Sequence, residues 1–148
     1  MALPTAKLLQ EFALIQGLKH RFAHRAPGLV HGIGDDAAVV EANSPRWWHL
    51  TTDLLAEGIH FDLKSAAPES IGYRAAMANL SDLAAMGAVP RYLLIALAIP
   101  KKMGQPHVYD LYRGLMTACR THGVALIGGD TSASKAGLFL SITLVGTT

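Results

Sequence analysis

Residues 92–127 read YLLIALAIPKKMGQPHVYDLYRGLMTACRTHGVALI. The first nine residues are almost continuously apolar, which predicts a strand covered on both faces, and Pro100 ends it. Pro106 begins a segment of helical periodicity that Gly123 ends, and Val124 to Ile127 forms a second short strand. Strand, helix and strand in this order predict a βαβ-type unit, and the rest of the fold is built around it.

The segment upstream of this unit predicts another helix. Pro68 in a first turn, followed by Glu69, is typical of a helix start, and Gly87 is typical of a helix end. Between them, one helical face carries small or apolar side chains and a single carboxylate, that of Asp82; its other members are Ile71, Ala75, Ala78 and Met86. We therefore expect Asp82 to lie on the face that packs against a sheet.

The flanking segments predict further strands. Ala37 to Val40 and Trp47 to Thr52 are short apolar segments on either side of a turn, and they would place Asp36 and Asp53 near opposite ends of a hairpin or on adjacent edges. Gly128 to Ser132 is typical of a turn, and Leu138 to Val145 alternates as a last strand. With an amphipathic helix up to Phe22, we expect an α+β domain whose mixed or antiparallel sheet carries helices on one face.

The composition excludes several classes of protein. The 148 residues fit one domain, with 51% hydrophobic and 16% charged residues and a net charge of +2. There is no block of basic residues for nucleic acid, and no apolar run long enough to span a membrane. The single cysteine, Cys119, lies in an apolar helical pattern, which predicts a buried thiol and a reducing compartment, so we expect a cytoplasmic protein.

Carboxylates at strand and turn ends indicate the chemistry. Five of the seven aspartates lie in short segments rich in Gly, Ser or Thr: Asp35, Asp36, Asp53, Asp82 and Asp130. Singly, each of them is as well explained as a turn or cap residue. As a set they would repel one another unless a cation neutralised them, and Mg²⁺ prefers oxygen ligands of this kind. We therefore predict a magnesium site.

Glycine-rich turns beside these carboxylates indicate phosphate. Gly32, Gly34, Gly128 and Gly129 would let backbone amides approach phosphate oxygens, although each alone also fits an ordinary turn. The dinucleotide fingerprint is excluded because residues 32–37 lead into a strand, and the P-loop motif of nucleotide-binding proteins is absent. His60 would contact an anionic substrate or be a plain loop histidine.

Four motifs resemble those of thiamine-monophosphate kinases, in their N-terminal half. They are GIGDDA at 32–37, TTD at 51–53 with His60-Phe61, NLSDLAAMG at 79–87 and IGGDT at 127–131. Looser versions occur in related enzymes, such as aminoimidazole ribonucleotide synthetase. The resemblance implies that residues 1–148 form an N-terminal domain binding ATP and Mg²⁺, with the family's larger C-terminal domain absent from this chain.

The same resemblance implies an activity and a role for each matching residue. The family transfers the γ-phosphoryl group of ATP directly to thiamine monophosphate, and it forms homodimers through this domain's sheet. Asp53 and Asp82 would be the catalytic centre and would bridge several Mg²⁺ ions; His60 would contact the thiamine substrate, and Tyr112, Gly129 and Asp130 the nucleotide. The implied metal ligands are Asp36, Thr51, Thr52, Asp53, Asp82 and Asp130, with Asp35 behind them.

Two other hypotheses stay open from the sequence. One keeps the fold and ATP but changes the acceptor, as in the related synthetases. The other is a dimerising, metal-binding domain without catalysis.

Overall fold

The computed structural model describes residues 13, 16–17, 19–20, 27–34, 36–41 and 45–148 of the chain. The helix expected up to Phe22 falls mostly outside these residues, and Asp35 falls outside them as well. None of the described helices is both long and apolar enough to cross a membrane.

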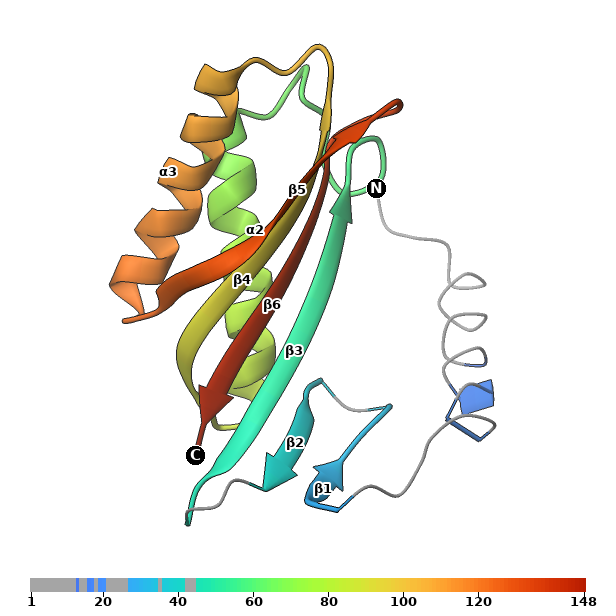
Figure 1. Ribbon diagram of the computed structural model, residues 1–148, viewed down its shortest axis with the longest axis vertical. Helices are drawn as coiled ribbons and strands as arrows, with labels where there is room; N and C mark the ends of the chain where they lie inside the picture. The colour runs from blue at the N-terminus through green and yellow to red at the C-terminus, as the bar shows by residue number, and fades with distance from the viewer. Residues whose placement is uncertain (1–12, 14–15, 18, 21–26, 35, 42–44) are drawn as a thin grey trace.

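The described strands form one six-stranded sheet in the order β1-β2-β3-β6-β4-β5. Strands β4 and β5 are parallel, as the βαβ-type unit predicts, and every other neighbouring pair is antiparallel, so the sheet is mixed. The last strand, β6, lies between β3 and β4 (Figure 1). The strands are β1 (Leu29–His31), β2 (Ala38–Glu41), β3 (Trp47–Ala56), β4 (Val89–Pro100), β5 (Ala125–Ser134) and β6 (Phe139–Thr147).

Two helices, α2 (Pro68–Ala85) and α3 (Gln105–Thr121), lie side by side on one face of this sheet (Figure 1). The expected α+β architecture with helices on one face is therefore confirmed. The helices touch closely because each has a glycine at the contact: a Cβ on Gly72 would lie 1.9 Å from Leu111 O, and one on Gly114 would lie 1.8 Å from Glu69 O. No side chain fits there.

Alternation along the central strands separates a core face from a free face. Leu93, Ile95 and Leu97 of β4 are buried against the helices, as are Leu140, Ile142 and Leu144 of β6. Cys119 of α3 is buried in the same core, as predicted. The opposite side of the sheet, which we call the free face, exposes large apolar side chains, namely Leu50, Leu54, Tyr92, Leu94 and Ile127.

Two expectations about local structure were wrong, and one pair of alternatives was decided. Gly128 to Ser132 is not a turn but the middle of β5, because the parallel pairing with β4 supplies its hydrogen bonds. Strand β4 is covered on one face and not on both, because Tyr92 and Leu94 are exposed. Of the two arrangements expected for Asp36 and Asp53, the structure favours adjacent strand edges over opposite ends of a hairpin: Ala38 pairs with Leu50 in antiparallel register, so the residues before β2 run alongside β3 toward Asp53.

Candidate functional site

Strand β3 and helix α2 bring together three of the predicted metal ligands. Thr51 is 6% exposed on the core face of β3, and its Oγ1 donates a hydrogen bond of 2.9 Å to Asp82 Oδ2 on α2. Asp53, two residues further along β3, points to the same face. The small side chains around Asp82 allow α2 to come close to β3. The motif that carries Asp82 therefore also makes this contact possible.

Negative charge accumulates at this contact. Partial burial raises the pKa of Asp53, and the neighbouring Asp82 carboxylate raises that pKa further. Asp82 also lies in the last turn of α2, which contains no basic residue, and the helix macrodipole places partial negative charge at that end. Two carboxylates and a helix C-terminus therefore face one region in which a cation would be stabilised.

Thr52 lies on the other side of the strand. Its side chain is on the free face, where Oγ1 donates to the carbonyl oxygen of Ile142 at 3.0 Å and accepts a hydrogen bond of 3.2 Å from Thr143 Oγ1. Within one chain, Thr51 and Thr52 therefore cannot offer their hydroxyl groups to the same ion.

His60 lies in a tight loop, residues 57–61, directly after β3. The backbone N–H of Ala56 donates to His60 Nδ1 at 3.0 Å, and the carbonyl oxygen of Ala56 accepts from the His60 N–H at 3.0 Å. A ring nitrogen that accepts carries no proton, so the neutral ring has its proton on Nε2. His60 thus presents Nε2–H as a hydrogen-bond donor.

Two residues that the sequence reasoning missed hold this loop. Arg74 of α2 donates from Nη1 to the His60 carbonyl oxygen at 3.0 Å, and Glu57 accepts from Lys102 Nζ at 2.8 Å. Arg74 lies two helical turns before Asp82 on the same side of α2, which is a signal the sequence contained. Glu57 carries no comparable signal, because its partners are distant in the chain.

A second group of predicted residues meets between α3 and β5. Tyr112 of α3 and residues 128–131 of β5, with Leu126, line a hollow of about 470 Å³. Burial raises the pKa of the Tyr112 hydroxyl. At Gly129 a Cβ would lie 1.9 Å from the carbonyl oxygen of Ile95, and the residue has φ 154°, so glycine is required there. Glycine at this position therefore lets β5 pack closely on β4 at the hollow beside Tyr112.

The two groups lie at one level across the sheet. Asp53 pairs with Ile142, Ile142 with Ile95, and Ile95 with Gly129, so one row of residues joins them. Three strand spacings of about 4.8 Å separate the ends of this row by roughly 14 Å. Asp130 is next to Gly129, whereas Asp36 precedes β2 on the opposite side of β3.

The four carboxylates do not form one cleft in a single chain. Among the described residues, no three or more His, Cys, Asp or Glu side chains gather as a metal-binding group. The oxygen donors that do meet, from Thr51, Asp53 and Asp82, are of the type that Mg²⁺ takes, and Mg²⁺ usually completes its shell with water and substrate phosphates.

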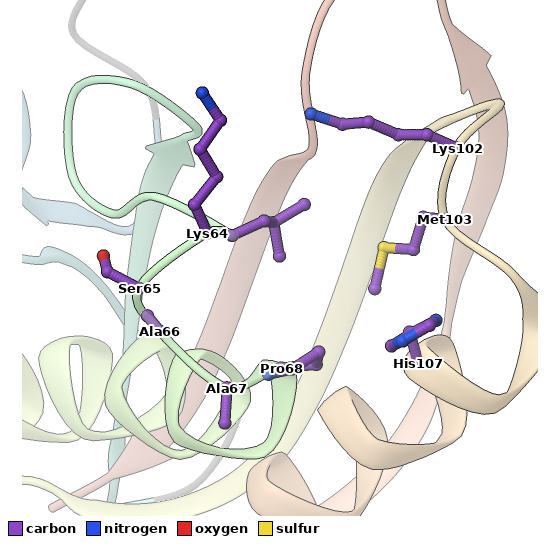
Figure 2. A pocket seen from close by; sticks show the side chains of 9 residues that line it. Lys64, Ser65, Ala66, Ala67, Pro68, Lys102, Met103 and His107 are labelled. Atoms are coloured by element: carbon purple, nitrogen blue, oxygen red, sulfur yellow. The ribbon is translucent and has the colours of Figure 1, made fainter.

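A separate hollow of about 550 Å³ lies at the N-terminal ends of α2 and α3 (Figure 2). Lys64 and Lys102 lie on its two sides, above Met103, Pro68 and His107. None of the predicted site residues lines it, so it is distinct from the sites described above.

Comparison with known proteins shows the family. The model of AIR synthase related protein, N-terminal domain, matches residues 34–148, which include both groups of site residues. The chain belongs to this family. The family match covers the whole sheet except β1, together with both helices.

Several individual proteins that are similar to this chain are thiamine-monophosphate kinases. The chain is 36% identical over 138 residues to that of Bacillus subtilis, covering 93% of this chain and 42% of the relative. It is 42% identical over 113 residues to that of Synechococcus elongatus, covering 76% and 34%. A solved structure described as AaThiL complexed with AMPPCP and TMP matches with a TM-score of 0.84 and 38% identity over 100% of this chain and 44% of that one. The chain spans less than half the length of these relatives.

Proposed function

We propose that this AIR synthase related domain is the nucleotide- and magnesium-binding part of a cytoplasmic thiamine-monophosphate kinase. The reaction would move the γ-phosphoryl group of ATP to the phosphate of thiamine monophosphate and yield thiamine diphosphate. The observation that carries the proposal is the contact between Thr51 and Asp82 beside Asp53. Asp53 lies in the same row of the sheet as Gly129. The similarity to thiamine-monophosphate kinases supports the choice of acceptor.

Magnesium is the cation that the Asp53 and Asp82 region suits. Its donors are carboxylate and hydroxyl oxygens, without the nitrogen or sulfur that zinc prefers. When bound, Mg²⁺ would screen the repulsion between two polyanionic substrates. Asp53 and Asp82 would hold the ion, and the Thr51 hydroxyl keeps the Asp82 carboxylate oriented.

The hollow beside Tyr112 suits the nucleotide. An aromatic ring offers a stacking surface for a base, and the missing side chain at Gly129 lets β5 lie close against Ile95 of β4 beside that ring. A nucleoside triphosphate has its base and its terminal phosphate far apart, so a site whose two parts lie at the ends of one row fits its length.

The residues of the chain fit a phosphoryl transfer that needs no strong general base. The attacking oxygen of a phosphate acceptor is already deprotonated near neutral pH, so catalysis consists of positioning and charge screening. His60 donates a hydrogen bond from Nε2, which suits an anionic or hydrogen-bond-accepting group of the acceptor. No covalent phosphoenzyme is required.

The free face of the sheet supports a homodimer. Leu54 is 60% and Ile127 56% exposed, and they lie with Leu50, Tyr92 and Leu94 on the side away from the helices. Clustered apolar side chains of this kind mark association surfaces. Thr52 lies on this face, and Asp130 is paired in register with Ala96 there, so a second copy would bring further oxygen donors toward the boundary.

Calorimetric titration of thiamine monophosphate into the chain tests the function. With AMPPCP and Mg²⁺ present, we expect thiamine monophosphate to bind, and the acceptors of the related synthetases not to do so. Equal binding of another acceptor would support a different enzyme of the same superfamily. A chain that binds Mg²⁺ but binds neither the nucleotide nor any acceptor would support a non-catalytic metal-binding domain.

A further inference from the structure

Glu57 joins three segments that are distant in the sequence. It follows the last residue of β3, and its backbone N–H donates to the carbonyl oxygen of Leu138 at 2.9 Å. Its side chain turns back to the same residue, because Oε2 accepts from the Leu138 N–H at 2.8 Å. The other carboxylate oxygen, Oε1, accepts from Lys102 Nζ at 2.8 Å. Glu57 thus connects the end of β3, the start of β6 and the turn after β4.

The environment of Glu57 is built for a carboxylate. The side chain is only 12% exposed, whereas that of Lys102 is 61% exposed. The hydrogen bond from Lys102 and that from the Leu138 amide lower the pKa of Glu57, so it is ionised at neutral pH. A Cβ on Gly137 would lie 2.8 Å from Glu57 Oε2, so the neighbouring chain leaves room for this carboxylate.

Glu57 is not itself an open ligand for a metal or substrate. Both of its oxygens already accept charge-assisted or backbone hydrogen bonds, unlike those of Asp53. Its influence passes through the loop that it begins. Glu57 pairs with Phe61 across that loop, Gly58 N–H donates to the Phe61 carbonyl oxygen at 2.8 Å, and His60 lies between them.

We propose that Glu57 is a positioning residue: by fastening the loop 57–61 to β6 and Lys102, it holds His60 with Nε2–H directed toward the acceptor. The proposal rests on the proposed function of His60. Ala56, whose N–H donates to His60 Nδ1, immediately precedes Glu57, so a shift of Glu57 moves the group that fixes the His60 ring. Lys102 also lines the hollow at the helix N-termini (Figure 2).

The test is Glu57→Gln in the 148-residue chain. The amide nitrogen of Gln would face either the Leu138 N–H or the Lys102 ammonium group, so one of the two connections is lost. We expect the ring ¹⁵N signals of His60 to move from those of a single Nε2–H tautomer toward a mixture. The affinity for thiamine monophosphate, measured with Mg²⁺ and AMPPCP, should fall about tenfold, in the range seen for supporting residues, while that for AMPPCP stays unchanged.

Matched variants separate positioning from general stability. Glu41→Gln changes a carboxylate on β2 and should behave as the unmodified chain. Lys102→Met should shift the His60 signals in the same direction as Glu57→Gln does. Lys102→Arg keeps the ion pair, so its His60 signals should match those of the unmodified chain. If Glu57→Gln does not fold, Lys102→Met decides: wild-type His60 signals in that variant would overturn the proposal.

Failure of the proposed function and failure of the positioning role of Glu57 would give different results. If the unmodified chain binds neither AMPPCP nor thiamine monophosphate, the proposed function is contradicted, and the His60 spectrum of Glu57→Gln still decides the role of Glu57. If the unmodified chain binds both and Glu57→Gln leaves the His60 signals and the affinity for thiamine monophosphate unchanged, only the positioning role is overturned.

Discussion

Thr51 and Asp82 are joined by a hydrogen bond of 2.9 Å, donated by Thr51 Oγ1 to Asp82 Oδ2, although 31 residues separate them in the chain. The bond ties the middle of β3 to the last turn of α2, close enough to Asp53 for the Asp82 carboxylate to raise the pKa of Asp53. It brings the TTD motif at 51–53 and the NLSDLAAMG motif at 79–87 together in one site.

Replacing Thr51 with Val keeps the shape of the side chain and removes the hydroxyl. We expect the free energy of unfolding to fall by about 1 kcal/mol, the usual net worth of a hydrogen bond. The affinity for Mg²⁺ should fall about tenfold, because the Asp82 carboxylate loses its orientation. Thr51→Ser keeps the hydroxyl and serves as the control. Calorimetry with Mg²⁺ and AMPPCP gives the affinities, and equal Mg²⁺ affinity in Thr51→Val would contradict this role.

Asp53→Asn removes one of the two repelling carboxylates. Because the folded protein raises the pKa of Asp53, the folded state holds its proton more tightly than the unfolded chain, and this carboxyl costs stability as the pH rises above about 4. Without metal, Asp53→Asn should therefore have a higher Tm than the unmodified chain at pH 7 and the same Tm at pH 3. With Mg²⁺ and nucleotide the order should reverse. Scanning calorimetry at the two pH values checks the sign, and a lower Tm at pH 7 without metal would show that the repulsion is absent.

Gly129→Ala tests the nucleotide hollow. The new Cβ would meet the carbonyl oxygen of Ile95, whereas at Gly128 the nearest heavy atom to a Cβ is Leu94 Cδ2 at 3.9 Å. Gly129→Ala should therefore shift β5 away from β4 and weaken AMPPCP binding by tenfold or more, an order-of-magnitude expectation for a misplaced binding group. Gly128→Ala is the matched control and should bind AMPPCP as the unmodified chain does. If Gly129→Ala binds AMPPCP as tightly as Gly128→Ala and the unmodified chain do, the nucleotide binds elsewhere.

Leu54→Asp tests the free face. Leu54 is 60% exposed on the sheet, and Tyr109 is equally exposed on the outer side of α3. If two copies associate through their sheets, a charge at Leu54 becomes buried without a partner and should convert the dimer to a monomer. Tyr109→Asp should leave the dimer intact. Sedimentation velocity gives the masses, and a monomeric unmodified chain or a dimeric Leu54→Asp would contradict the interface.

The sequence was sufficient for the elements whose limits are set locally. Helix α2 runs between Pro68 and Gly87 because proline suits a first turn and glycine a helix end, and α3 follows the same rule. The apolar run of β4 likewise predicts a strand, but only its core face is covered, because Tyr92 and Leu94 are exposed on the free face. In each case the residues that decide the structure are neighbours in the chain.

The sequence was not sufficient where partners are distant. Residues 128–132 have turn composition, yet they form β5 because β4 offers a complete parallel ladder. The insertion of β6 between β3 and β4 separates Asp130 from Asp53, and strand order is not encoded in local periodicity. The candidate residues were therefore named one by one from the sequence, whereas their division into a β3 group and a β5 group, and the contacts of Glu57, required the structure.

Magnesium-dependent nucleotide binding tests the central claim most directly. AMPPCP would be titrated into the 148-residue chain with Mg²⁺ and again with chelator, and both titrations would be repeated on Asp53→Asn. We predict binding that requires Mg²⁺ in the unmodified chain and is lost in Asp53→Asn while the fold is retained. AMPPCP binding that is the same with chelator, or that Asp53→Asn leaves unchanged, would contradict the assignment of Asp53 and Asp82 as the magnesium site.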